Sequence, residues 1–133
     1  MMPQINKPII PITGRLTLEY QSPEYRLLKQ VEHLIEARFR EQLHLNYYAK
    51  AAGMGLSQLN RVLLKHKGKT LSALLDERLL AEAKVQLQHT CQPAKVISYE
   101  LGFSDPSYFY RYFKRKTGMT VMEFRKHPNR MYE

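Results

Sequence analysis

Apolar residues recur at helical spacing in two long segments of the chain. Within residues 22–40, the side chains that share one helical face are Leu28, Val31, Ile35 and Phe39. Within residues 70–88, an uninterrupted stripe is formed by Leu71, Leu74, Leu75, Leu79, Ala83 and Leu87. Polar residues occupy most of the other positions. Each segment is therefore predicted to form one amphipathic helix with a single buried face.

Residues typical of helix ends mark where several helices begin. The segment Ser-Pro-Glu at 22–24 supplies an N-cap, a first-turn proline and a carboxylate at the positive end of the helix. The Thr and Glu of segment 120–123 have the spacing of a capping box and predict a last helix. Prolines in residues 1–21 block a long helix there, so this stretch is interpreted as an arm or linker, and residues 127–133 as a tail.

The most informative feature is an internal repeat. Four residues of the first copy, Arg61, Lys65, Gly68 and Thr70, recur fifty positions later as Arg111, Arg115, Gly118 and Thr120. Gly53 is matched by Gly102, and a glycine there ends a short helix in the left-handed conformation. Each copy predicts two short helices around a tight turn, over about 45–66 and about 93–116. With the helix over 70–88 between them, the sequence predicts an all-α fold of about seven helices, in which two helix-turn-helix subdomains are joined by a long linker helix.

Length and composition indicate a single domain with a polyanionic partner. A chain of 133 residues, 44% of them hydrophobic, can bury one core, which excludes large barrel enzymes and disorder throughout. Lys and Arg number 21 against 12 Asp and Glu, and the net charge of +9 favours nucleic acid or an anionic membrane surface. No apolar run approaches about 18 residues and no signal peptide follows Met1, so a cytoplasmic protein with no membrane partner is expected.

The distribution of charge favours DNA over a membrane surface. Residues 57–69 contain four Lys or Arg and no acidic residue, and the same holds for residues 106–122. The charges of the other two segments are close to balanced. Residues 22–40 contain four basic and three acidic residues, and residues 70–88 contain two basic and three acidic residues. The positive segments are thus the second helices of the two predicted motifs. In a helix-turn-helix this is the helix that enters the DNA major groove.

The second copy also carries a motif of a known family. Residues 96–120 contain Gly-Phe, then Tyr-Phe-x-Arg-x-Phe-Lys, then Gly-x-Thr, and resemble the second helix-turn-helix of AraC/XylS-type transcription regulators. The first copy is similar to the family's first helix-turn-helix and linker helix at Ala49, Gly53, Met54, Leu59, Arg61, Gly68, Arg78 and Ala83. The resemblance covers about residues 24–126. Within it, Tyr110 stands where the family commonly has Ser, which affects the expected base preference.

The resemblance implies a DNA-binding domain over residues 22–126 with its two recognition helices in successive major grooves of double-stranded DNA. It implies a bacterial transcription regulator, with activation as the expected output and RNA polymerase as a second candidate partner. Family members commonly dimerise through a separate sensing domain, so this chain is expected to be monomeric. Two interpretations stay open: a stand-alone regulator, or a DNA-binding piece of a longer one, which the proline-rich arm favours.

The same resemblance, together with position on the second helices, gives the candidate contact residues. Those expected to contact bases are Ser57, Asn60, Arg61, Ser107, Tyr108, Tyr110 and Arg111. Those expected to contact phosphates are Lys65, Lys67, Lys69, Lys114, Arg115 and Lys116. The guanidinium of Arg61 can pair with guanine, and the amide of Asn60 with adenine. A phosphate contact or a helix cap is the alternative role for Asn60 and Ser57.

Other functions have less support in the sequence. An enzyme would have to use Cys91, but no His or cation next to it would activate the thiol, so no catalytic role is expected. The histidines form no convincing ligand cluster, so neither a metal nor a cofactor is expected. A nonspecific architectural DNA-binding module remains the alternative. The four phenylalanines Phe103, Phe109, Phe113 and Phe124 are expected in the core, and Tyr47, Tyr48, Tyr99 and Tyr112 half-buried with hydrated hydroxyls.

Overall fold

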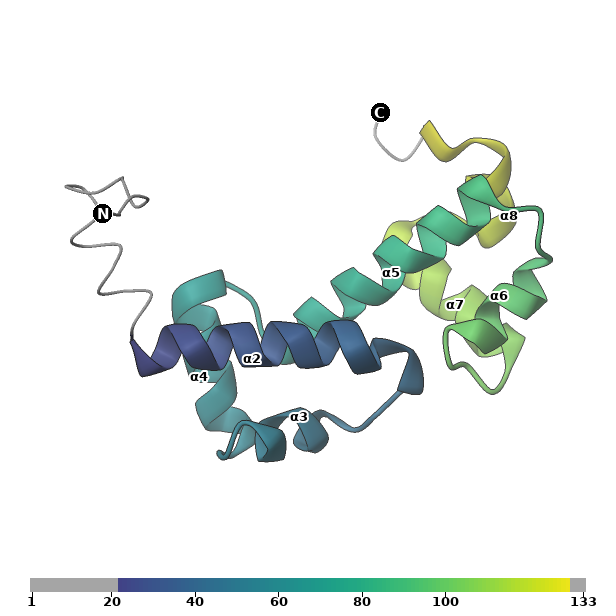
Figure 1. Cartoon of the computed structure of the whole chain (residues 1–133). Helices are drawn as coiled ribbons and strands as arrows, with labels where there is room; N and C mark the ends of the chain where they lie inside the picture. Colours follow the sequence, from purple (N-terminus) through teal and green to yellow (C-terminus); the bar gives the residue numbers. More distant parts are fainter. Residues whose placement is uncertain (1–21, 130–133) are drawn as a thin grey trace, which may run out of the picture.

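The computed structural model describes residues 22–129, and the regular secondary structure within this range is all helical, as predicted (Figure 1). The described range contains seven α-helices, and the short 3-10 helix η1 follows the first of them. Their bounds are α2 Pro23–Arg38, η1 Phe39–Glu41, α3 Leu45–Ala51, α4 Leu56–Lys67, α5 Leu71–His89, α6 Ala94–Glu100, α7 Pro106–Thr117 and α8 Val121–Lys126. The arm predicted over residues 1–21 and the end of the predicted tail, 130–133, lie outside the described residues.

The predicted helix ends are confirmed by their hydrogen bonds. The Ser22 hydroxyl accepts from the backbone N–H of Tyr25 at the start of α2, and α7 has Asp105 as N-cap and Pro106 in its first turn. Thr120 and Glu123 form the capping box of α8. Such caps satisfy backbone donors that have no partner inside the helix.

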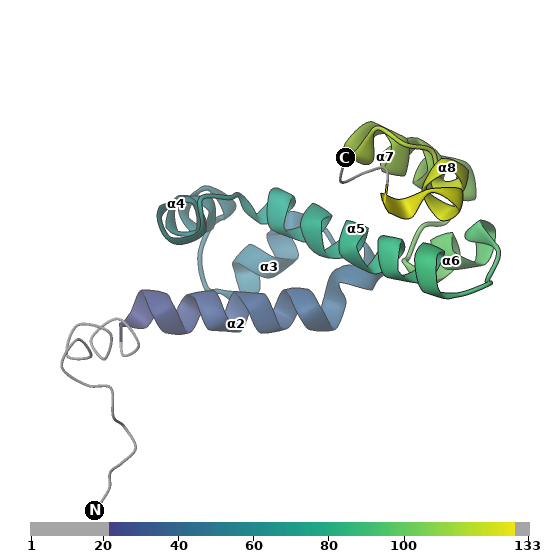
Figure 2. The same ribbon diagram turned by 90° about the horizontal axis from the view of Figure 1, so that it is seen from above.

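The linker helix α5 forms part of two lobes. The first lobe packs α2, α3 and α4 around the N-terminal part of α5, and the second packs α6 and α8 around its C-terminal part (Figure 1). Figure 2 shows α5 running between α2 on one side and α7 and α8 on the other. The guanidinium of Arg125 in α8 donates to the carbonyl oxygens of Leu87 at 3.0 Å and Thr90 at 3.3 Å, which fastens α8 to the end of α5.

The buried side chains of both lobes form one hydrophobic cluster. All four phenylalanines expected in the core are buried, and Phe109, Phe113 and Phe124 are fully so. The prediction for the tyrosines is wrong at Tyr48 and Tyr112, which are only 1% and 6% exposed. Their rings lie on the inner faces of α3 and α7, where burial of an aromatic ring outweighs hydration of its hydroxyl.

The turn between α6 and α7 packs directly against the first lobe. Gly102 has a φ of +92°, and a Cβ added there would lie 2.0 Å from the carbonyl oxygen of Arg40. Gln42, which follows η1, donates from Nε2 to the carbonyl oxygen of Leu101 at 3.2 Å. The lobes therefore touch at η1 as well as through α5.

A network of charges joins the end of α2 to α5. The guanidinium of Arg78 donates to both carboxylate oxygens of Glu36, at 2.7 and 2.9 Å, and also reaches Glu82 at 3.4 Å. Arg40 pairs with the same Glu82 at 3.4 Å. The two guanidinium groups stand 4.4 and 4.3 Å from the ring centre of the buried Phe39. In the sequence Glu36 lies four residues before Arg40, a spacing typical of an ion pair within one helix. In the structure its partner is Arg78 of α5.

Replacing Gly102 by Ala is expected to destabilise the fold more than the same change at Gly53. Both glycines have positive φ, a conformation that costs an L residue about 1–2 kcal/mol. Nothing lies within 4 Å of a Cβ built on Gly53, whereas the one built on Gly102 meets backbone. We expect Gly102→Ala to lower the free energy of unfolding by about 1–3 kcal/mol more than Gly53→Ala, measured by urea unfolding. Equal losses would contradict the close contact between the lobes.

Candidate nucleic-acid interface

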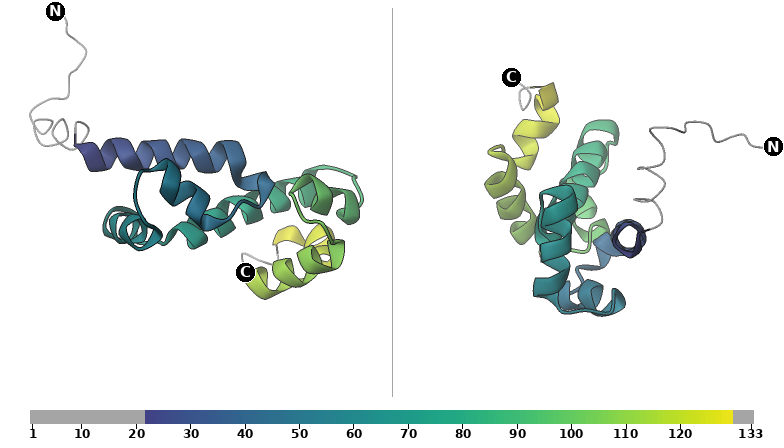
Figure 3. Two further views of the ribbon diagram at one scale, coloured as in Figure 1. Left: turned by 90° about the horizontal axis from the view of Figure 1, so that it is seen from below. Right: turned by 90° about the vertical axis from the view of Figure 1, so that its left-hand side faces the viewer.

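The second helix of each repeat, α4 or α7, lies away from α2: α4 beside the N-terminal end of α5, and α7 on the far side of α5 (Figure 2, Figure 3). Each follows a short helix of seven residues, α3 or α6, and a tight turn. The turns contain Gly53 and Gly102, with φ of +77° and +92°. The two predicted helix-turn-helix motifs are therefore confirmed, and both of their second helices lie away from α2.

The exposed face of α4 carries two of its predicted base contacts. Ser57 and Arg61 are exposed and lie one helical turn apart, so they share a face, while Leu59 and Leu63 are buried behind it. Arg61 forms no ion pair with any residue of the range 22–129. Its guanidinium is consequently available to a ligand at the middle of the recognition helix.

Asn60 has a structural partner inside the protein. Its Oδ1 accepts a hydrogen bond of 2.9 Å from the backbone N–H of Leu71, the first residue of α5. That N–H has no acceptor within its own helix, so Asn60 acts as a cap supplied by a neighbouring helix. A bidentate contact with adenine would need the same oxygen. The helix-cap role, the alternative for this residue, is the one that the structure displays.

The face of α7 repeats the arrangement of α4 with larger side chains. Ser107 and Arg111 are exposed and one turn apart, as Ser57 and Arg61 are. Tyr108 is 52% exposed, and its ring stands edge-on to the buried Phe103 with 5.7 Å between centroids. Tyr110 is half-buried, with its ring 6.0 Å from that of Phe109. The four predicted base contacts of α7 thus reach the surface to different extents.

Carboxylates of the protein itself hold four of the six predicted phosphate contacts. The pairs are Lys65–Glu24 at 3.4 Å, Lys67–Glu32, Lys69–Glu77 and Lys116–Asp76 at 2.9 Å. The other two residues, Lys114 and Arg115, are exposed and have no acidic partner within residues 22–129. Sequence reasoning missed these pairs because their acidic members lie on α2 and α5, up to 41 residues from the lysines.

These contacts change the protonation equilibria of the acidic residues. The pKa of Glu24 is lowered, first by its hydrogen bond with His66 at 2.6 Å and then by Lys65. The pKa of Glu32 is lowered chiefly by its hydrogen bond with Lys67. The pKa of Glu36 is lowered chiefly by its hydrogen bond with Arg78. All of these carboxylates are stabilised in their charged form.

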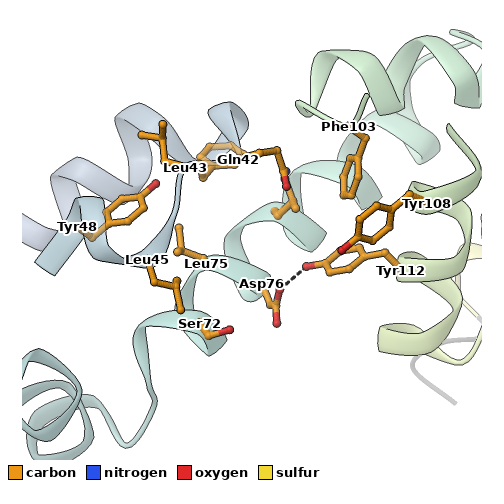
Figure 4. A pocket seen from close by; sticks show the side chains of 12 residues that line it. Gln42, Leu43, Leu45, Tyr48, Ser72, Leu75, Asp76, Phe103, Tyr108 and Tyr112 are labelled. Atoms are coloured by element: carbon orange, nitrogen blue, oxygen red, sulfur yellow. Dashed lines mark hydrogen bonds between the residues drawn. The ribbon is translucent and has the colours of Figure 1, made fainter. Parts of the chain in front are cut away.

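A cleft of about 360 Å³ separates the two lobes beside α5 (Figure 4). Leu43 and Tyr48 line one wall, and Tyr108 and Tyr112 the other, with Asp76 of α5 between them. The hydroxyl of Tyr112 donates to Oδ1 of Asp76 at 2.5 Å. Burial, and then this carboxylate, raise the pKa of Tyr112 far above its ordinary value, so the hydroxyl stays protonated.

Neither a metal centre nor a membrane span is found in the described part of the chain. No three His, Cys, Asp or Glu side chains within residues 22–129 are grouped so that they could hold a metal ion. None of the helices described combines the length and the apolar character that crossing a membrane requires. Cys91 is exposed in the loop between α5 and α6.

Known proteins share this arrangement. The profile of a family described as "Helix-turn-helix domain" matches residues 48–127. The HTH-type transcriptional activator RhaS of Enterobacter sp. (strain 638) is 29% identical over 99 residues, which are 74% of this chain and 36% of RhaS. The chain thus spans little more than a third of that relative.

Solved structures agree with the fold. A transcriptional regulator of Chromobacterium violaceum, from the proteins that contain an AraC-type DNA-binding domain, has a TM-score of 0.65 and 26% identity, over 78% of this chain and 96% of that chain. The DNA-binding domain of the global transcriptional factor AdpA, solved with a target DNA, has a TM-score of 0.65 over 83% of this chain and 96% of that chain. At 18% identity the second likeness concerns the fold alone.

Replacing Asn60 by Ala is expected to lower the free energy of unfolding by about 1 kcal/mol, because the N–H of Leu71 loses its acceptor. Asn60→Asp keeps an acceptor at the N-terminus of α5 and should retain most of the stability. Urea unfolding of both variants measures the difference. An Ala variant as stable as the unmodified chain would show that the cap contributes nothing.

The lowered carboxylate pKa values predict a loss of stability in acid. A group whose pKa is lower in the folded state stabilises it above the unfolded pKa, and this contribution disappears as the pH falls through the folded value. The melting temperature is therefore expected to fall as the pH drops below about 4.5, because Glu24, Glu32 and Glu36 become protonated. In Glu36→Gln the fall should be shallower, whereas in Glu100→Gln, at an exposed position without an ion pair in the described range, it should be unchanged. Identical pH profiles for all three proteins would contradict the assignment.

Proposed function

Because the chain belongs to the AraC/XylS family of helix-turn-helix transcription regulators, we propose that it places α4 and α7 in two successive major grooves on one face of double-stranded DNA. The observation that carries this proposal is the placement of two exposed, basic helices away from α2 and joined by one linker helix (Figure 3). A groove of B-DNA admits one helix, and successive grooves on a face repeat at about 34 Å. The two motifs supply one helix for each groove.

The length of the linker helix bears on the shape of the bound DNA. The 19 residues of α5 span about 28 Å, and α7 contacts it at Asp76, in its N-terminal half. This span is shorter than the groove repeat of about 34 Å. The DNA is thus expected to bend toward the protein, at a cost of a few kcal/mol that depends on the steps between the two grooves. Flexible steps at the centre of the site favour binding.

The candidate residues divide into base readers and phosphate contacts. Arg61 is the strongest base reader, because it is exposed, has no ion pair in the described range and can donate two hydrogen bonds to guanine. Ser57, Ser107, Tyr108, Tyr110 and Arg111 are weaker candidates, and Asn60 serves chiefly as a cap. Lys114 and Arg115 are the phosphate contacts with no internal carboxylate to displace among the described residues. Lys65, Lys67, Lys69 and Lys116 must exchange a protein carboxylate for a phosphate, so each contributes less net affinity.

The proposed role is binding, without catalysis, in the cytoplasm of a bacterium. Activation through contact with RNA polymerase is the proposed output, since a relative named as an activator matches over 99 residues. The chain is proposed to bind as a monomer, since its two motifs already provide both groove contacts. A nonspecific architectural module is the alternative, and it would bind a selected site no more tightly than random DNA at the same salt concentration.

Replacing Arg61 by Ala is expected to relax specificity at one base position and to cost about 1–3 kcal/mol of binding there. Selection of bound sequences from a random DNA pool supplies the site, and titration of all four bases at each position measures the change. Lys114→Ala is the matched control: it should weaken binding uniformly and reduce the salt slope by about one. Uniform weakening by Arg61→Ala would contradict base reading.

A further inference from the structure

Both recognition helices are fastened to the same short stretch of α5. Asn60 of α4 accepts from the N–H of Leu71, and Tyr112 of α7 donates to Asp76. The two attachment points are five residues apart, or about 7.5 Å along the helix axis. The first two turns of α5 thus hold both recognition helices directly, in addition to the packing of α7 against α6 and α8.

The attachment of α7 has two points. Oδ1 of Asp76 accepts from the hydroxyl of Tyr112 at 2.5 Å, and Oδ2 pairs with Nζ of Lys116 at 2.9 Å. Tyr112 and Lys116 are one turn apart on α7, so a single carboxylate holds two successive turns of the recognition helix. A contact of this kind opposes rotation of α7 about its axis and sliding along it. Figure 4 shows the Tyr112 bond at the edge of the cleft between the lobes.

The other contacts of α7 lie mainly within its own lobe, where it packs against α6 and α8. Phe109 and Phe113 bury its inner face completely, but apolar burial has no preferred direction. Hydrogen bonds are directional, and those made to a charged group are stronger than neutral ones. Because Tyr112 is 6% exposed, water competes little for its hydroxyl.

We propose that Asp76 and Tyr112 are positioning residues that fix the distance and rotation between the two grooves that this protein reads. They act through α7 and contact no DNA. This inference rests on the proposed function. It adds that binding is strictly selective for the number of base pairs between the two half-sites. One extra base pair moves the second half-site by about 3.4 Å and turns it by about a tenth of a helical turn. A fixed α7 cannot follow this change, whereas a loosened one can.

The test measures binding of the full chain to the selected site and to versions with one base pair inserted or removed between the half-sites. When both motifs can no longer bind together, the unmodified chain should lose affinity on the order of 100-fold. In Tyr112→Phe and Asp76→Asn the same insertion should cost about tenfold or less. Their affinity for a single half-site should exceed or equal that of the unmodified chain.

Two features keep the comparison specific. Asp76→Asn removes a negative charge and frees Lys116, which raises affinity for all DNA, so the ratio between spacings is the quantity to compare. Tyr112→Phe removes one oxygen without a change of charge, and Tyr99→Phe, at a tyrosine that is 49% exposed on α6, is its matched control. Tyr99→Phe should keep the full spacing penalty. If Asp76→Asn does not fold, the test rests on Tyr112→Phe and on its ratio of affinities for the selected and the altered spacing.

The outcomes separate this inference from the function on which it rests. If the unmodified chain prefers the selected site but Tyr112→Phe keeps the same spacing penalty, the positioning role is overturned and the proposed function stands. If the unmodified chain does not prefer the selected site over random DNA, the proposed function fails and the positioning role fails with it. A relaxed spacing preference with unchanged half-site affinity supports both.

Discussion

The apolar stripe of α5 is the constraint on which the rest of the structure depends. Its two ends, Leu71 and Leu87, are 0% and 1% exposed, one in each lobe. The short helices α3, α6 and α8 have six or seven residues each, too few to be stable without packing. They gain that packing from α5 and from their neighbours, so the lobes, their turns and the recognition helices depend on one shared helix.

Charge is arranged around this frame in two ways. Carboxylates of α2 and α5 neutralise the lysines at the end of α4, which limits repulsion within a chain of net charge +9. Arg61 and Arg111, in the middle of the recognition helices, have no acidic partner among the described residues. Arg61 and Arg111, like Lys114 and Arg115, therefore have no internal carboxylate to displace, while many of the remaining cations stabilise the fold.

Local sequence signals predicted the fold well, because caps, glycines and apolar periodicity act over a few residues. Ser22 and the capping box at Thr120 begin their helices as predicted. The lysine pairs and the bond between Tyr112 and Asp76 join residues 8 to 41 apart, and no spacing rule shows which side chains meet at such distances. For Asn60 the sequence did not show that its side chain meets the backbone N–H of Leu71, because the two residues belong to different helices.

The close approach of Gly102 to Arg40 has a consequence for the repeat itself. Gly53 and Gly102 occupy the same place in the two copies, yet open space surrounds the first and the backbone of the other lobe adjoins the second. The duplicated units are therefore equivalent in shape but not in surroundings. A chimera with two first copies would contain the motif twice. It would still lack the close contact of the Gly102 turn with the Arg40 backbone, which joins the two lobes.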